Sequence, residues 1–325
     1  MLRKKLARRT AAAVTGAGLF FGVMTGVAPA GATVSTTVTA PFPLCSANEP
    51  APVLVDSVKG AAFEGLAVDA RGRLYATDLS TGNVYRFDHP GAPATVLTTV
   101  PTGNGAGALA FAPNGGLLIG YASVPTQLLG DLLRSGHIEE MNLTTGVVTQ
   151  VASGLSAADG LAVAADGTIY ATNDFGNLVG RVSPTGQVDP AWANLPSANG
   201  AVLSSDGRYL YESRTFVNPG VSRIPTADPA HPQSLIDLTG SAAFDALDGL
   251  TLDSRDRPVI PTDISGEILR VDGPGQICHL SNAPTVSSVV IYGHGSSGFS
   301  AGRLFRAGFD GQIYEIPAAF DPGGR

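Results

Sequence analysis

A phrase of about fifteen residues recurs along this chain and constrains its fold more than any other feature. It consists of a polar residue, a glycine, a short apolar run, a turn and a second apolar run. Clear copies begin at Glu64, Asp159, Asn199 and Asp248, and weaker copies begin at Gly107 and Ser287. A unit of short strands that recurs roughly every 40 to 50 residues is typical of propeller blades.

Within each copy the apolar runs are too short for helices, and their alternation favours β-strands. In the first copy, residues 66–68 and 74–76 are the expected strands, and Gly72 supplies the positive φ of the hairpin between them. Third strands are expected at 84–87, 138–143, 178–182, 221–224, 267–271 and 312–316, and fourth strands at 95–100, 147–151, 233–238 and 277–280. Blade three has no well-marked fourth strand. The sequence thus predicts an all-β, six-bladed β-propeller of four-stranded antiparallel blades.

The last blade runs out of chain near Ile316, so its fourth strand must come from elsewhere. Residues 53–58 read as a strand and precede the first copy, and closure through them removes the open sheet edges. This closure brings Cys45 close to the outer strand of blade five, which contains Cys278. These are the only two cysteines, and a pair in an exported chain favours a disulfide. We therefore predict a Cys45–Cys278 disulfide.

The first 32 residues have the pattern of a secretory signal peptide. A basic start is followed by an apolar, small-residue stretch and by an Ala-Gly-Ala exit at 30–32. A membrane anchor fits less well, because the stretch is rich in Gly, Ala and Thr. Arg8 and Arg9 leave both the Sec and the Tat route open. The expected division is signal peptide 1–32, N-terminal segment 33–50, propeller 51–317 and C-terminal tail 318–325.

The formal net charge of the chain is −7, and it becomes −12 without the five basic residues of the first 32. An acidic chain without a Lys/Arg stripe is a poor partner for nucleic acid or an anionic membrane. We expect a secreted, extracellular monomer with no membrane span after signal removal. Its acidity suits cations.

The first strand of each blade lines the channel of a propeller, so the residues at its start meet at one mouth. Glu64, Asp159, Asn199 and Asp248 should therefore converge. The second strands end on the same face, and they bring Asp78, Asn173, Asp174, Ser213 and Asp263 around this ring. Carboxylates this close repel one another unless a cation lies among them. Their hard oxygen atoms favour Ca²⁺, with Mg²⁺ or Mn²⁺ as alternatives and Zn²⁺ as a poorer fit.

Glu-Gly in the first copy, Asn-Gly in the fourth and Asp-Gly in the fifth resemble the regucalcin/gluconolactonase family of sugar lactone lactonases, which are six-bladed propellers. The resemblance covers about residues 50–317. It implies that Glu64, Asn199 and Asp248 hold a divalent cation, usually calcium, and that Asp248 is the general base. It also implies hydrolysis of a lactone or related ester, in which the metal polarises the carbonyl and activated water attacks it.

The chain departs from this family in the third copy. Ser156 and Ala158 stand where sugar-lactone members carry Arg-x-Asn before Asp-Gly, so the contacts that grip a polyhydroxylated lactone are missing. We expect side chains around the ligands to contact the substrate or to support the metal site, namely Asp159, Asp78, Asn173 and Asp263. The linker 122–135 is either a short apolar lid or a packed loop.

Two other functions fit the same residues. One is a non-catalytic calcium-binding propeller that binds a ligand or a protein, and the other is a phosphotriesterase-like hydrolase. A serine nucleophile is disfavoured, because the chain has no G-x-S-x-G elbow.

Overall fold

The computed structural model describes residues 34–101, 105–121 and 124–324, and one compact unit spans Val34–Arg325. The predicted signal peptide lies outside the described residues, so secretion stays a prediction. Among the described helices, none is long and apolar enough to cross a membrane.

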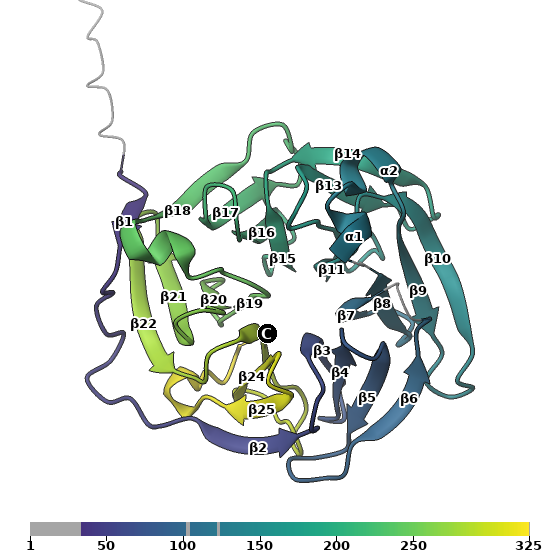
Figure 1. Ribbon diagram of the computed structural model, residues 1–325, viewed down its shortest axis with the longest axis horizontal. Helices are drawn as coiled ribbons and strands as arrows, with labels where there is room; N and C mark the ends of the chain where they lie inside the picture. The colour runs from purple at the N-terminus through teal and green to yellow at the C-terminus, as the bar shows by residue number, and fades with distance from the viewer. Residues whose placement is uncertain (1–33, 102–104, 122–123, 325) are drawn as a thin grey trace, which may run out of the picture. The chain divides into compact units, whose positions relative to one another are not determined.

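Six β-sheets are arranged around a central axis (Figure 1). Within each sheet, consecutive strands of the chain pair antiparallel, and the first strand of each blade lies nearest the axis. The predicted six-bladed β-propeller is therefore confirmed.

The strands of the first three blades follow the chain in order. Blade one contains β3 (Phe63–Val68), β4 (Leu74–Asp78), β5 (Asn83–Phe87) and β6 (Thr95–Thr99). Blade two contains β7 (Ala106–Phe111), β8 (Leu117–Tyr121), β9 (Gly136–Met141) and β10 (Val148–Leu155). Blade three contains β11 (Leu161–Val163), β12 (Ile169–Ala171), β13 (Leu178–Val182) and β14 (Val188–Asn194).

The last three blades include two strands from the N-terminal part of the chain. Blade four contains β15 (Ala198–Leu203), β16 (Tyr209–Arg214), β17 (Gly220–Pro225), β18 (Gln233–Thr239) and also β1 (Thr37–Thr39). Blade five contains β19 (Thr251–Leu252), β20 (Pro258–Pro261), β21 (Glu267–Gly273) and β22 (Gln276–Asn282). Blade six contains β23 (Ser287–Tyr292), β24 (Leu304–Gly308), β25 (Gln312–Glu315) and β2 (Val53–Ser57).

Blade six closes the ring as the sequence predicts. β2 pairs antiparallel with β25, from Val53 opposite Glu315 to Ser57 opposite Gln312. The predicted disulfide is also present, with 5.0 Å between the Cα atoms of Cys45 and Cys278. The two cysteines are 233 residues apart, so the bond ties the N-terminal segment to blade five.

The N-terminal segment contributes more than a cysteine. β1 pairs parallel with β18, with Thr37 opposite Asp237, and makes a fifth strand in blade four. The Cys45 backbone N–H then donates to His279 in blade five, at 2.8 Å. Residues 34–57 therefore contact the outer edges of blades four, five and six in turn (Figure 1).

The hairpin in each copy is held by local polar chemistry. In blade one, the Asp69 carboxylate accepts hydrogen bonds from the backbone N–H groups of Arg71 and Arg73 at 2.9 and 3.0 Å. Gly72 has φ +73°, and a Cβ there would lie 2.0 Å from the carbonyl oxygen of Ser297. Only glycine fits this turn.

The apolar core lies between neighbouring blades. For example, Leu118 and Ile138 of blade two pack against Leu161 and Ile169 of blade three. Side chains of the first strands pack between neighbouring blades. Around the axis, the six first strands line a channel (Figure 1).

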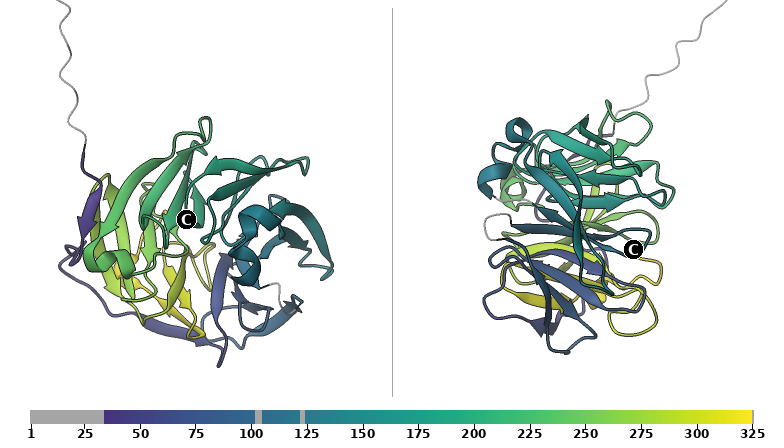
Figure 2. Two further views of the ribbon diagram at one scale, coloured as in Figure 1. Left: turned by 45° about the horizontal axis from the view of Figure 1, so that its top comes forward. Right: turned by 90° about the vertical axis from the view of Figure 1, so that its right-hand side faces the viewer.

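The described residues include four short helices outside the blades. The linker 122–135 contains α1 (Val124–Gln127) and α2 (Gly130–Leu133), which lie together on one face of the propeller (Figure 2). The 3₁₀ helix η1 (Gly240–Phe244) precedes blade five, and η2 (Pro317–Ala319) follows β25. The Tyr292 hydroxyl donates to the Ala319 carbonyl at 2.9 Å, which holds the C-terminal segment against blade six.

Candidate metal centre and central channel

The four polar residues of the repeat line one cavity in the centre of the propeller. Glu64 lies in β3 and Asn199 in β15, while Asp159 lies two residues before β11 and Asp248 three residues before β19. Asp248 is only 4% exposed, and Asp159 and Asn199 are also buried. We call these four residues the ring.

The close approach of neighbouring blades requires the glycine after three of the ring residues, Glu64, Asp159 and Asn199. A Cβ on Gly65 would lie 2.5 Å from the Gly107 carbonyl oxygen, and one on Gly160 would lie 2.1 Å from the Asn199 carbonyl oxygen. Neither position has room for a side chain. The glycine of the repeat is therefore needed for packing between blades, whereas the residue before it can vary and can bind a ligand.

A hydroxyl at the end of the second strand links neighbouring blades at the ring. The Ser213 hydroxyl accepts from the Gly200 N–H at 2.9 Å and donates to the Asp248 carbonyl at 2.7 Å. Thr77 makes the same link between Gly65 and Gly107.

Thr172 makes this link between Gly160 and Asn199. In blade two, the N–H of Ala108 donates to the carbonyl of Asp159, which is the ring residue of the next blade. In blade five, the N–H of Gly249 donates in the same way to the carbonyl of Ser288 in blade six. Ser288 therefore occupies the ring position of blade six, one residue beyond the start that the repeat indicates. These links fix the backbone of each ring residue relative to the next blade.

A second threonine orients the side chain of Asn199. Its Nδ2 donates to the Thr215 hydroxyl at 3.0 Å, and that hydroxyl donates to the Leu247 carbonyl at 2.7 Å. Because the amide nitrogen is held in this way, the carbonyl oxygen of Asn199 is the atom left to bind a ligand.

Asp159 is held by two groups that the repeat does not contain. The Gln127 side chain, at the end of α1, donates to Asp159 Oδ1 at 2.9 Å, and both residues are buried. Asp159 also shares a side-chain hydrogen bond with Asp174. Burial raises the pKa of Asp159 to about 6 against its hydrogen bonds. Burial and the Asp159 charge raise the pKa of Asp174 to about 9, so Asp174 carries the proton of this pair.

Residues 124–135 of the linker are anchored over blade three. Asn173 Nδ2 donates to the Gln127 carbonyl and to the Ser156 hydroxyl, both at 2.9 Å. Ser156 donates in turn to Asp131 at 2.7 Å, and Asp131 accepts from the Asn177 N–H at 2.8 Å. In this structure the linker is packed down, with its contacts centred on Ser156 and Asn173.

The ring carries more negative charge than its neighbours neutralise. Burial, followed by repulsion from Asp159, Asp263 and Asp174, raises the pKa of Glu64 well above its usual range. The pKa of Asp248 is raised in the same direction by burial and then by Glu64 and the other carboxylates. Burial raises the pKa of Asp263 to about 7, against the attraction of Arg306.

Three oxygen atoms in this region are buried without a hydrogen-bond partner among the described residues: Glu64 Oε2, Asp174 Oδ1 and Asp263 Oδ1. Over the same part of the chain, no three His, Cys, Asp or Glu side chains form a ready-made metal cluster. Glu64, Asn199 and Asp248 nevertheless fit a hard divalent cation chemically, because they offer oxygen atoms, and Glu64 Oε2 has no other partner.

Two expected neighbours of the ring are engaged elsewhere. The Asp78 carboxylate accepts from the Ala62 and Ser80 N–H groups, each at 2.9 Å, and from the Thr81 hydroxyl at 2.5 Å. Burial acts to raise its pKa, but these bonds outweigh burial, so its pKa lies below the usual value. Asp78 and Asn173 both lie outside the lining of the cavity, as does Asp263.

The cavity continues from the ring along the first strands, with a volume of about 380 Å³. It reaches His294, which follows β23 at the end opposite Ser287. Burial lowers the pKa of His294, while Asp69 acts in the other direction. His294 therefore lines the same channel as the ring but lies away from the ring carboxylates.

Sequence reasoning missed Gln127, Thr215 and the Asp159–Asp174 pair. Gln127 lies in an insertion outside the repeat, so no periodic signal indicates it. The hydroxyl links had a signal: Thr or Ser follows the second apolar run before Asp78, Asn173 and Arg214. That recurrence could have identified them.

No family model matches the chain, and no curated protein does. Solved structures do. A gluconolactonase from Xanthomonas campestris has a TM-score of 0.65 and 18% identity, and the match covers 86% of this chain and 97% of that one. A calcium-binding protein, regucalcin, from Agrobacterium tumefaciens has a TM-score of 0.64 and 18% identity, over 90% and 98% of the two chains.

Virginiamycin B lyase from Staphylococcus aureus is similar at a TM-score of 0.54 and 16% identity, over 81% of this chain and 86% of the lyase. At such identities the shared property is the fold. The chain has the six-bladed propeller fold of the gluconolactonase and regucalcin structures, as the resemblance in its sequence implies.

Proposed function

We propose that the protein is a secreted, metal-dependent hydrolase of lactones or related esters, with calcium as the expected ion. The observation that supports this most is the buried end of the channel, where Glu64, Asn199 and Asp248 line one cavity. There, Glu64 Oε2 has no hydrogen-bond partner among the described residues. Buried carboxylates without a cationic partner favour cation binding.

Each residue has a defined part in the reaction. Glu64, Asn199 and Asp248 would hold the ion, which when bound polarises the substrate carbonyl and keeps nearby carboxylates ionised. The Asp248 carboxylate takes a proton from the attacking water. Thr215 orients Asn199, and Ser213 fixes the Asp248 backbone.

The test is metal analysis of the purified mature protein, followed by a pH-indicator screen over lactones, esters and phosphotriesters with and without a chelator. We expect about one divalent ion per chain and turnover of a lactone or ester that the chelator abolishes. Full activity after complete metal removal would contradict the proposal. Preferred turnover of phosphotriesters would assign the protein to the phosphotriesterase-like alternative.

One observation favours a second candidate, a calcium-binding module without activity. Ser156 stands where sugar-lactone enzymes contact their substrate, but its hydroxyl bonds to Asp131 of the linker and to Asn173. Tight metal binding without turnover of any substrate in the screen would support that reading.

A further inference from the structure

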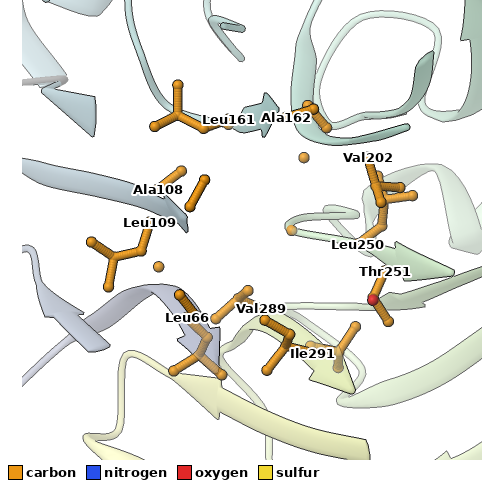
Figure 3. Close-up of a pocket in the computed structure, with 18 of the residues that line it drawn as sticks. Leu66, Ala108, Leu109, Leu161, Ala162, Val202, Leu250, Thr251, Val289 and Ile291 are labelled. Carbon is orange, nitrogen blue, oxygen red and sulfur yellow. The ribbon is translucent and has the colours of Figure 1, made fainter. Parts of the chain in front are cut away.

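The side chains that line the channel beyond the ring are almost all apolar. Apart from the ring, the polar side chains that line it are Thr251 and His294. The labelled side chains around the open space in Figure 3 are hydrocarbon except for the Thr251 hydroxyl: Leu66, Ala108, Leu109, Leu161, Ala162, Val202, Leu250, Val289 and Ile291. The ring thus forms a polar end of the cavity, and the side chains along the first strands form a mainly apolar wall.

Several of these apolar side chains remain accessible. Ala108, Ala110, Val202, Leu203 and Ile291 are half-buried, although they belong to the innermost strands. The volume of about 380 Å³ lies within the range of small-molecule sites. Apolar surface in a channel of this size is best covered by an apolar ligand.

A sugar lactone suits this channel poorly. Each hydroxyl that leaves water without a hydrogen-bond partner opposes binding. Beyond the ring the side chains of the walls offer few partners, namely Thr251 and His294, and Ser156 and Asn173 are bonded to Asp131 and Gln127. A polyhydroxylated ring would therefore leave several groups unpaired.

The face next to the ring is also apolar. Phe175, which adjoins Asp174 in the chain, stacks on Phe216 with ring centroids 5.0 Å apart, and both rings are partly exposed. Leu128, Leu129 and Leu132 are exposed on the linker beside Gln127. The surroundings of the carboxylates thus match the channel in character.

Building on the proposed function, we propose that the substrate is an amphiphilic lactone or ester whose alkyl chain lies along the central channel, with its carbonyl at the ring. Hydrolysis breaks the acyl carbon–oxygen bond of the lactone. Water supplies hydroxide to the acyl carbon and a proton to the released alkoxide, which gives a hydroxy acid with the same alkyl chain.

The test compares δ-gluconolactone with γ-butyrolactone and γ-decalactone on the metal-loaded full-length mature protein. We expect kcat/KM to rise at least tenfold from γ-butyrolactone to γ-decalactone and to be lowest for δ-gluconolactone. Preference for δ-gluconolactone, or no dependence on chain length, would overturn the inference and leave the proposed function standing. Failure to hydrolyse any lactone or ester would overturn both.

Two variants locate the alkyl chain. Ala110→Leu, further along β7, narrows the channel, and Val202→Thr keeps its shape but adds a hydroxyl. Each should lower kcat/KM for γ-decalactone at least fivefold and change that for γ-butyrolactone less than twofold. Ala191→Leu, at an exposed position of β14, is the matched control and should change neither. Equal losses on both substrates in a folded variant would overturn this placement.

Binding provides a readout without turnover. Sodium decanoate, as a product-like probe, should bind the metal-loaded protein in calorimetry at least tenfold more tightly than sodium gluconate, and Ala110→Leu should weaken decanoate alone. Equal affinities for the two carboxylates would contradict an apolar site.

Discussion

The hydroxyl of Ser213 donates a 2.7 Å hydrogen bond to the backbone carbonyl of Asp248, across the boundary between blades four and five. The same hydroxyl accepts from Gly200, next to Asn199. A single buried oxygen therefore sets the distance between the backbones of two of the proposed metal ligands.

Ser213→Ala should retain the fold and lose turnover. Removal of the two bonds should cost about 2 kcal/mol or more of stability, because the Gly200 N–H and the Asp248 carbonyl both lose a buried partner. A displacement of Asp248 should lower kcat about tenfold with little change in KM, which corresponds to about 1.4 kcal/mol. Ser213→Thr should restore most of the activity. Ser204→Ala, at the hairpin of the same blade, is the control, and an equal loss of kcat there would argue against a positioning role.

Asp248→Asn and Glu64→Gln test the general base and the metal site. Asp248→Asn removes the general base and should lower kcat by about 10² to 10⁴. Its melting temperature in the metal-free state should be at least that of the wild type, because burial and the neighbouring carboxylates oppose the charge of Asp248. Glu64→Gln removes one ligand charge and should weaken calcium binding in a titration. Asp228→Asn changes an exposed carboxylate in blade four and should alter neither property. Wild-type turnover in Asp248→Asn would exclude it as the base.

Glu212→Met should stabilise the protein. Glu212 is fully buried opposite Ala201, and neither of its carboxylate oxygens has a hydrogen-bond partner among the described residues. The corresponding positions in blades one and three hold alanine, namely Ala76 and Ala171. Replacement of an unpaired buried carboxylate by an apolar side chain of similar size should contribute about 1 to 4 kcal/mol at neutral pH.

The gain from Glu212→Met should depend on pH. Burial raises the pKa of Glu212 well above its usual value, so the folded state binds its proton more tightly than the unfolded chain. Wild-type stability must therefore fall as pH rises above the unfolded value of about 4.3. The difference in melting temperature should be small at pH 4 and large at pH 8. Glu140→Met, on the less buried strand β9, is the control. A constant difference across this range would contradict an ionisable cause.

Loss of the disulfide should destabilise the closed ring. The bond closes a loop of 233 residues, and the chain-entropy model gives about 5 kcal/mol as an upper figure. Cys45→Ser with Cys278→Ser should lower the melting temperature, and reductant should lower that of the wild type equally. Reductant should not affect the double variant. An unchanged wild-type melting temperature after both thiols have been shown to be released would refute this role.

Blade number, closure and disulfide could be predicted because each follows from a condition on the whole fold. The repeat gives one blade per copy, and the unpaired edge after Ile316 requires a strand from the N-terminal side. That strand then determines where Cys45 lies. These inferences need no knowledge of individual side-chain contacts.

The parts that could not be predicted depend on local contacts without a periodic signal. β1 has three residues and acquires its strand geometry only by pairing with β18. β14 contains Pro190, which interrupts the alternation that would mark a strand. Gln127 contacts Asp159 from an insertion, and its partner is set by how the linker folds over Asn173. Such contacts follow from packing in three dimensions.

The close approach of neighbouring first strands has a consequence for how such a site can diversify. Because the glycines make the closest contacts with the neighbouring blade, the residue before each glycine can be exchanged with little disturbance to the blades. Gly107 and Ser288 already occupy two of these places with residues that bring no charge. Removing the carboxylate of Asp159 should therefore change the ion preference while the architecture persists. Descendants of one scaffold could thus diverge in chemistry faster than in shape.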